Sequence, residues 1–435
     1  MEWKKIYKNK VVSVEEAASK IKSGDRVWIQ SAASTPAALV NAMCNRYQEL
    51  ENVEIHEGLA FHVFDCFKAE LKGHISDHSW YMGGPTRKFK KFGNINYASI
   101  HLSKLYEYIE KVAPTVTICE VSQPDEDGYM CYGPSGVVTG YESVKTADRI
   151  IVQVNKNVPF IYGENNKIHV SEVTYICEND HPVPELPQAP MSEEDKAIAK
   201  HIIPYISDGS TIQLGIGGTA NAVGYGLEDK KDLGVHSEML TDSMVYLAKI
   251  GVINNSKKNY KPGKMVISFG LGSKELYEFM DKNPSIEIKP FKDVNDPQKI
   301  AKNDNLISIN NALSVDLIGQ VSSDSIGYNQ FSSTGGQLDF VRGAVMSKGG
   351  KSFICLPSTV NSKEGRKSRI VMAFSPGTAV TVPRTDAQYI VTEYGVADVY
   401  CKSIQERAKA IISIAHPDYR EELTKQAIEA GLIKE

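Results

Sequence analysis

The chain has 435 residues, of which 42% are hydrophobic and 23% are charged, and its formal net charge is -4. This length allows two domains with separate cores, and the charge offers no general basic face for nucleic acid. No run of about 18 uncharged apolar residues predicts a membrane span, and the start MEWKKIYKNK lacks the apolar core of a signal peptide. We therefore expect a cytoplasmic protein that binds neither nucleic acid nor membrane.

Short β-branched runs alternate with helix-like segments along the chain. In chain order, we predict a helix at 14–24, strands at 116–121 and 148–154, a helix at 191–206, strands at 210–216, 351–357 and 387–394, and a helix at 404–415. This alternation is typical of α/β domains with largely parallel sheets.

A proline-rich segment interrupts this pattern. Between Glu178 and Ser192 the chain reads ENDHPVPELPQAPMS, and its four prolines exclude a regular helix or a central strand. We place a domain boundary here, which predicts an N-terminal domain at 1–185 and a C-terminal domain at 186–435.

The two halves contain matching segments in the same order. Residues 21–38 match residues 206–223 without a gap, and residues 121–136 resemble residues 321–336. The simplest interpretation is two domains of the same α/β fold, related by a pseudo-twofold axis. A site between the domains is then the default expectation.

The halves differ at one strand-to-helix turn. The second half has Gly215-Ile216-Gly217-Gly218-Thr219 where the first half has Gln30-Ser31-Ala32-Ala33-Ser34. Glycines let a ligand approach the backbone, and free N–H groups at a helix start favour anions. A tight turn without a ligand explains the glycines equally well. The spacing fits neither the Rossmann fingerprint nor a P-loop.

A second glycine turn follows at residues 332–344, which read SSTGGQLDFVRGA. Gly335 and Gly336 precede a segment with helical spacing, in which Asp339 and Arg342 could pair at i, i+3. A turn with a surface ion pair is the alternative. The two turns together favour one ligand pocket.

Between these turns the chain reads GVHSEMLTD, residues 234–242. Glu238 in this segment could be a solvated surface residue, a carboxylate that offsets a helix dipole, or a reacting group. His236 lies two residues earlier and could orient Glu238 or belong to the core.

Five runs together resemble the acetyl-CoA hydrolase/transferase family: LGIGGTANAV, GVHSEM, ISINNALSVDLIGQV, SSTGGQLDFVRGA and VTEYGVADV. The likeness extends over essentially the whole chain. It implies a CoA-transferase-like fold of two similar domains and an enzyme that moves coenzyme A between acetyl-CoA and butyrate or 4-hydroxybutyrate. We also expect a homo-oligomer, a dimer or larger.

The resemblance also implies roles for particular residues. Glu238 would be the nucleophile, and the residues that contact coenzyme A or polarise the thioester would be Gly215, Ile216, Gly217, Gly218, Thr219, Asn311, Ser333, Gly335 and Gly336. Relatives commonly read GxGGQ at the second turn, so Ser333 departs from the family pattern.

Chemistry explains why a carboxylate suits such an enzyme. A carboxylate attacks the acyl-CoA to give a mixed anhydride, the released thiolate then forms a glutamyl-CoA thioester, and the acceptor acid reverses the sequence. Coenzyme A is then a substrate, and we expect no permanently bound cofactor. No HExxH or CxxC sequence is present, so we also expect no metal and mostly buried, reduced cysteines.

Several alternatives remain open. Glu57 occupies roughly the place of Glu238 in the first half, but the turn before it lacks glycines, and Glu393 could border the site or pair with an arginine. Residues 79–93 could shape the acyl pocket or form an exposed basic loop. The rival functions are an acyl-CoA hydrolase and a noncatalytic coenzyme A or metabolite-binding module. No GxSxG sequence supports a serine thioesterase.

Overall fold

The computed structural model describes residues 2–434 of the chain. Its contacts divide the chain into two compact units. Unit 1 comprises Met1–Pro187, Glu238–Leu240 and Val266–Val294, and unit 2 comprises Gln188–Ser237, Thr241–Met265 and Asn295–Glu435. The main division, between residues 187 and 188, falls inside the proline-rich segment.

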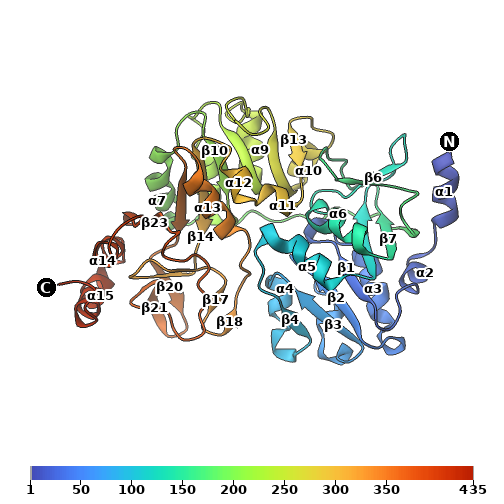
Figure 1. Ribbon diagram of the computed structural model, residues 1–435, viewed down its shortest axis with the longest axis horizontal. Coiled ribbons are helices and arrows are strands. Elements are labelled where there is room, and N and C mark those ends of the chain that lie inside the picture. Colours follow the sequence, from blue (N-terminus) through green and yellow to red (C-terminus); the bar gives the residue numbers. More distant parts are fainter. Residues whose placement is uncertain (1, 435) are drawn as a thin grey trace. The chain divides into compact units, whose positions relative to one another are not determined.

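Unit 1 contains a seven-stranded sheet in the order β4-β3-β2-β1-β5-β7-β9. All neighbouring strands run parallel, and β1, β2 and β3 can be followed side by side in Figure 1. The strands are β1 (Arg26–Ile29), β2 (Val53–Glu57), β3 (Ile75–Ser79), β4 (Ile95–Tyr97), β5 (Val116–Val121), β7 (Arg149–Val154) and β9 (Tyr175–Glu178). The strand order reverses between β1 and β5, which is where ligands bind in open α/β sheets.

Helices connect these strands. They are α1 (Glu2–Lys10), α2 (Val14–Ala18), α3 (Ala37–Asn45), α4 (Gly84–Arg87), α5 (Leu105–Val112) and α6 (Val137–Thr146). Helices α2 and α3 pack with Val27, Ile29 and Ile55 in one apolar core. The opposite face carries Trp28 and His56, whose rings stack with centroids 6.0 Å apart.

The second sheet has eight strands in the order β13-β12-β11-β10-β14-β19-β23-β24. Its strands are β10 (Thr211–Leu214), β11 (Gly234–Leu240), β12 (Met265–Gly270), β13 (Ile286–Ile288), β14 (Leu306–Asn311), β19 (Lys351–Cys355), β23 (Tyr389–Thr392) and β24 (Gly395–Asp398). Within this sheet, β10 runs parallel to β11 and β14, β14 to β19, and β19 to β23, whereas the edge pair β23–β24 is antiparallel.

Helices and small sheets complete the chain. The helices are α7 (Glu193–Ile202), α8 (Gly218–Tyr225), α9 (Asp242–Lys249), α10 (Lys274–Met280), α11 (Phe291–Val294), α12 (Pro297–Ile300), α13 (Gln337–Met346), α14 (Ile404–Ser413) and α15 (Pro417–Glu429). Short antiparallel pairs join β6 (Tyr129–Cys131) to β8 (Lys167–His169), β17 (Ser325–Ile326) to β18 (Asn329–Gln330) and β20 (Thr359–Ser362) to β21 (Gly365–Ser368). A three-stranded sheet contains β15 (Ser314–Asp316), β16 (Val321–Ser322) and β22 (Ile370–Val371).

The strand registers confirm that the two halves repeat one fold. In the first sheet Ile29 pairs with Ile118, and in the second Leu214 pairs with Ile309; the sequence match aligns Ile29 with Leu214. The second matched segments, 121–136 and 321–336, each lead directly into a ten-residue helix, α6 and α13. The predicted α/β class with largely parallel sheets is therefore confirmed.

One local expectation is wrong. The helix predicted at 14–24 ends at Ala18, and the chain then turns through Gly24 at φ +80° before it enters β1. The side chain of Arg342 donates to Asp386, 44 residues further along the chain, at 2.8 Å. The hydrogen bond with Asp386 is the main cause of the raised pKa of Arg342, and the charge of Asp339, three residues earlier, adds to it.

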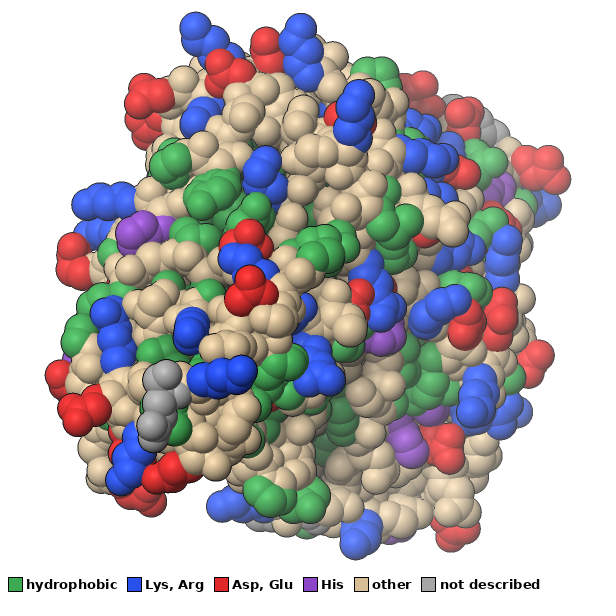
Figure 2. Space-filling view, turned by 60° about the vertical axis from the view of Figure 1, so that its left-hand side comes forward, with side chains coloured by type: hydrophobic (Ala, Val, Ile, Leu, Met, Phe, Trp, Pro, Cys, Tyr) green, Lys and Arg blue, Asp and Glu red, His purple; other side chains and the backbone are tan. Residues whose placement is uncertain are grey.

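The surface and the cysteines have simple features. In Figure 2, basic and acidic side chains are interspersed on the face in view. From residue 2 to residue 434, no helix has the length and apolar character needed to cross a bilayer.

All seven cysteines are free thiols; six are buried, and Cys401 is exposed.

Candidate active site

Glu238 lies on β11, a central strand of the second sheet. Its side chain is partly exposed, whereas the other six residues of this strand are buried. A fully extended strand alternates its side chains between two faces, so Glu238 shares a face with His236 and not with Ser237. The strand therefore presents one carboxylate with solvent access on an otherwise buried segment.

The first glycine turn connects β10 to α8. Gly217 has φ +125°, a conformation that is essentially restricted to glycine, and it is the N-cap of α8, where no side chain caps the helix. A Cβ on Gly218 would lie 2.2 Å from Oδ2 of Asp195. Gly217 is thus favoured by its backbone conformation and Gly218 by the close approach of Asp195. The first N–H groups of α8 are not satisfied by a capping side chain.

Asn311 and Thr219 hold this turn in place. Asn311, at the end of β14, donates from Nδ2 to the carbonyl oxygen of Ile216 at 2.8 Å. Thr219 donates from Oγ1 to Oδ1 of Asp195 at 2.5 Å, and its side chain is buried. Ile216 at the tip remains 48% exposed. The turn therefore presents its backbone and Ile216 outward, while the Thr219 hydroxyl is used internally.

The second glycine turn precedes α13. Gly335 has φ +62°, and Gly336 is the N-cap of α13, again without a capping side chain. Ser333 is buried, and its Oγ has no hydrogen-bond partner among the described residues. The side chain of Gln337 donates to the carbonyl oxygen of Asn311 at 3.4 Å. This bond links the second turn to the residue that holds the first turn, so the structure brings these two predicted elements together.

His236 is a core residue. Its side chain is fully buried, its Nδ1 lies 3.2 Å from Nδ2 of Asn303, and its ring packs near Tyr260 and Phe340 at centroid distances of 5.9 and 6.2 Å. These contacts favour the structural interpretation of His236.

Glu57 differs from Glu238 in position and in environment. In the first sheet Val27 pairs with Ile55, and in the second Ile212 pairs with Val235. The sequence match aligns Val27 with Ile212, so Ile55 corresponds to Val235. Two residues further along each strand, Glu57 therefore corresponds to Ser237 and not to Glu238. A shift of one residue reverses the face of a strand. Burial raises the pKa of Glu57 to about 7, although a hydrogen bond with Ser79 opposes the shift.

Glu393 is fixed by a serine. Its two carboxylate oxygens accept hydrogen bonds from the backbone N and the Oγ of Ser358, at 2.9 and 2.5 Å. The predicted alternatives were a place at the border of the site and a pair with an arginine; the hydrogen-bond partner that the structure gives is Ser358.

The segment at 79–93 is not a simple exposed loop. Trp80 is fully buried and packs edge-on against Phe291, with ring centroids 6.4 Å apart. The ring also fills the space beside Gly58, where a Cβ would lie 2.2 Å from an indole carbon. The first residues of this segment therefore belong to the core of unit 1.

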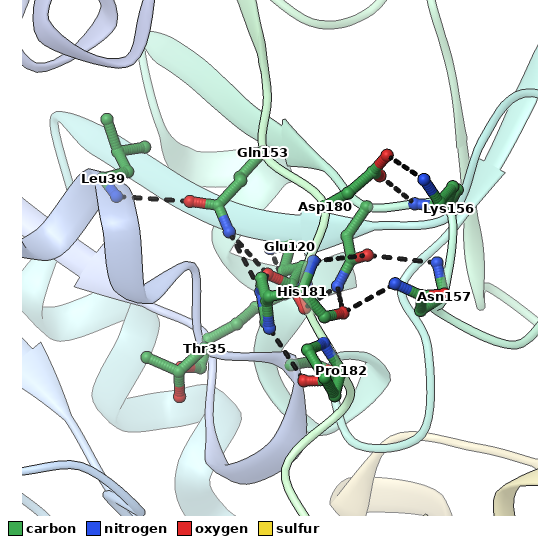
Figure 3. Close-up of polar contacts among 12 residues, drawn as sticks. Thr35, Leu39, Glu120, Gln153, Lys156, Asn157, Asp180, His181 and Pro182 are labelled. Atoms are coloured by element: carbon green, nitrogen blue, oxygen red, sulfur yellow. Dashed lines mark hydrogen bonds and ion pairs between the residues drawn. The ribbon is translucent and has the colours of Figure 1, made fainter.

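Sequence reasoning missed a polar network at the strand-order reversal of unit 1. Figure 3 shows His181 pointing toward Glu120 and Gln153. Oε2 of Glu120 lies 2.7 Å from Nε2 of His181 and accepts a bond of 2.6 Å from Gln153. Glu120 and His181 are 61 residues apart in the chain, so no local motif could have revealed the pair.

No group of three or more His, Cys, Asp or Glu side chains is placed to hold a metal ion within residues 2–434. His74 and His78 have the spacing HxxxH. His74 directly precedes β3 and His78 lies on it, and an extended strand does not bring residues four apart together as a helix does.

Comparison with known proteins gives the family. The description "Acetyl-CoA hydrolase/transferase N-terminal domain" matches residues 1–187, and "Acetyl-CoA hydrolase/transferase C-terminal domain" matches residues 272–427. The 4-hydroxybutyrate coenzyme A transferase of Clostridium kluyveri is 42% identical, with 98% of this chain and 99% of that protein covered. The butyryl-CoA:acetate CoA-transferase of Anaerostipes caccae is 41% identical, with 99% of each chain covered.

A solved structure agrees with these sequence matches. RipA from Yersinia pestis is 35% identical and superimposes with a TM-score of 0.94 over 100% of both chains. Two family models and relatives of more than 40% identity thus cover the chain almost from end to end. The chain therefore belongs to the acetyl-CoA hydrolase/transferase family, and it is a CoA-transferase.

Proposed function

We propose that the protein moves coenzyme A between acetyl-CoA and a short straight-chain carboxylate, butyrate or 4-hydroxybutyrate, by a ping-pong mechanism. The observation that carries this proposal is Glu238, a partly exposed carboxylate on an otherwise buried strand. The two relatives named for 4-hydroxybutyrate and for butyryl-CoA and acetate support the choice of acids.

Glu238 acts as the nucleophile in this proposal. Its carboxylate attacks the thioester carbonyl and expels the thiolate of coenzyme A, which leaves an acyl-glutamyl anhydride. The thiolate then attacks the glutamyl carbonyl and releases the free acid, which leaves a glutamyl-CoA thioester. The acceptor carboxylate reverses both steps. One thioester is broken and one is made, so no nucleotide is consumed.

The glycine turns would bind coenzyme A and stabilise charge. The uncapped N–H groups at the starts of α8 and α13 suit a phosphate or a developing oxyanion. Asn311 preserves the shape of the first turn through its bond to the Ile216 carbonyl. Loss of one oxyanion donor typically costs about 3–4 kcal/mol of transition-state stabilisation. Gly215, Ser333, Gly335 and Gly336 complete the proposed contact set.

Coenzyme A enters as substrate, and the proposed reaction needs no resident cofactor. Acyl-CoA and the acid are the binding partners, and we expect a homo-oligomer. The choice among short acids rests on small differences, since one methylene in a pocket is worth about 1–3 kcal/mol.

Steady-state kinetics test the proposal. Acetyl-CoA consumption should require added butyrate or 4-hydroxybutyrate, and double-reciprocal plots at several acid concentrations should be parallel, because one enzyme group carries coenzyme A between two half-reactions. Intersecting lines would indicate a ternary complex and contradict the relay. Acetyl-CoA consumption that is independent of acid would indicate a hydrolase. Dicarboxylates that exceed butyrate by more than about tenfold, or 1.4 kcal/mol, would contradict the proposed acids.

A further inference from the structure

The Glu120–His181 pair lies at the start of the proline-rich linker. Glu120 comes from β5 and is fully buried, whereas the His181 side chain is 25% exposed. Gln153 and Asn155 also donate to the two oxygens of Glu120, at 2.6 and 3.3 Å. Gln153 is oriented by a bond from the backbone N of Leu39 to its Oε1, so its amide N must face the carboxylate.

The geometry fixes where the protons lie. Nδ1 of His181 is 2.8 Å from the carbonyl oxygen of Pro182, which can only accept, so Nδ1 carries a proton. Nε2 faces the Glu120 carboxylate at 2.7 Å. A neutral imidazole would direct the lone pair of Nε2 at that carboxylate, so a hydrogen bond requires a second proton between Nε2 and Oε2. The favoured state is an imidazolium paired with a buried carboxylate.

The linker beyond this pair is anchored to unit 1. The carbonyl oxygen of His181 accepts bonds from the side chains of Asn155 and Asn157, at 3.0 and 2.9 Å. Further along, Tyr277 donates to the carbonyl oxygen of Pro184 at 2.7 Å, and the backbone N of Leu186 donates to Gly272 at 3.0 Å. His181 contributes the buried ionic contact of this anchored segment.

The other end of the linker contacts the helix that begins at the first glycine turn. Asn221 of α8 donates to the carbonyl oxygen of Ala189 at 3.1 Å. Ser192 and Asp195 then form a capping box at the start of α7, and Asp195 accepts the bond from Thr219 in the turn. The linker thus leads from the Glu120–His181 pair to the turn proposed to bind coenzyme A.

We propose that the Glu120–His181 pair is a proton-controlled latch, which anchors residues 179–186 and thereby sets the affinity of the α8 turn for acyl-CoA. Deprotonation of His181 would place the lone pair of Nε2 against the carboxylate and release the segment. The effect on acyl-CoA affinity rests on the proposed function, whereas the anchoring of residues 179–186 by the Glu120–His181 pair does not.

The charges around the latch determine the direction of its pH dependence. The hydrogen bond with Glu120 raises the pKa of His181 despite partial burial, and Asp180 adds to the shift. Asp180 is itself paired with Lys156 at 2.8 Å. On the other side, burial and the nearby His181 lower the pKa of His62. A raised histidine pKa stabilises the fold at acidic pH, and this contribution is lost as pH rises through the folded-state value.

Hydrogen exchange on the full-length protein tests the latch without any activity measurement. Protection factors of peptides within 179–186 should fall at least fivefold between pH 6.5 and 9.5. His181→Gln keeps a donor that does not titrate, so its protection should not depend on pH, and His181→Ala should be poorly protected throughout. His169→Gln is the matched control, since His169 is a partly exposed histidine that contacts Ser171 and the Asp127 carbonyl, away from Glu120, and it should behave as the unmodified protein. Equal protection in all proteins at every pH would overturn the latch.

Two further measurements separate the latch from the proposed function. The His181 imidazole of the unmodified protein should titrate in NMR spectra above the ordinary histidine value and shift downward in Glu120→Gln; an unshifted titration would overturn the ionic pair even if the His181 variants fail to fold. In kinetic assays, His181→Ala should raise KM for acyl-CoA at least threefold with kcat changed less than twofold, and His181→Gln should restore KM. An unchanged KM would overturn the coupling to the α8 turn, whereas absent transferase activity would contradict only the proposed function.

Discussion

Glu120 and Asn311 occupy the same register position in their respective sheets. The repeat aligns Ile29 with Leu214, and these residues pair with Ile118 and Ile309 in the neighbouring strands. Glu120 lies two residues after Ile118, and Asn311 lies two residues after Ile309. In the first sheet, this position holds a buried carboxylate in a closed side-chain network. In the second, it holds an amide that supports an open glycine turn. The equivalent strand end thus carries a buried side-chain network in the first half and supports a glycine turn in the second.

Substitution of Glu238 by alanine should abolish transfer, with a loss of at least about a thousandfold in kcat, because in the proposed relay this carboxylate carries coenzyme A. Protein incubated with acyl-CoA should gain the mass of coenzyme A less water on the peptide that contains Glu238. Glu57→Gln is the control and should retain both adduct and turnover. An adduct on Glu57, Glu393 or a cysteine would contradict the assignment of the nucleophile.

Asn311→Ala should weaken acyl-CoA binding more than it weakens the fold. The substitution removes the bond to the Ile216 carbonyl, and a net loss of about 1 kcal/mol corresponds to roughly a fivefold increase in KM. Asn310→Ala is the matched control, since Asn310 bonds instead to Gln213 and Ser308. It should lower the melting temperature and leave KM unchanged. Equal KM values in both variants would argue against the role of Asn311.

Gly217→Ala should reduce activity by altering the first turn. Its φ of +125° strains any residue with a Cβ, and that Cβ would lie 2.9 Å from Nδ2 of Asn311. Gly251→Ala is the control, because Gly251 also has a positive φ, +82°, but no atom would lie within 4 Å of a Cβ added there. We expect both to lose some thermal stability and only Gly217→Ala to raise KM for acyl-CoA, as measured by steady-state kinetics. A similar rise in Gly251→Ala would attribute the effect to general destabilisation.

Gly58→Ala should destabilise unit 1 by about 1–3 kcal/mol, because the new methyl group would overlap the Trp80 ring in a filled core. Gly84→Ala adds a methyl group where no atom lies within 4 Å and should change stability by less than about 0.5 kcal/mol. Denaturant unfolding measures both. Comparable stabilities would show that Trp80 does not occupy this space.

Glu57 makes stability depend on pH. Burial raises its pKa from 4.5 to about 7, so the folded protein binds a proton that the unfolded chain releases between these values. The associated stability is fully present below pH 4.5 and is lost as pH rises through about 7. Glu57→Gln cannot titrate, so its stability relative to the unmodified protein should rise from pH 5 to pH 8 in denaturant unfolding. A constant difference would contradict the raised pKa.

The sequence by itself determined the fold class and the repeat. Hydrophobic runs such as 116–121 and 210–216 are local signals, and they form β5 and β10 as predicted. The match of 21–38 with 206–223 depends on the same apolar periodicity, and the registers of both sheets agree with it. The sequence also indicated the turn at Gly217, because a backbone position that requires positive φ favours glycine whatever its surroundings.

Only the tertiary structure decided which polar groups meet. Arg342 was three residues from Asp339 but bonds to Asp386, and Glu120 meets His181 across 61 residues. Such contacts depend on strand order and on where each segment crosses the sheet, and a one-dimensional pattern contains neither. The register likewise separated Glu57 from Glu238, since a shift of one residue moves a side chain from one face of a strand to the other.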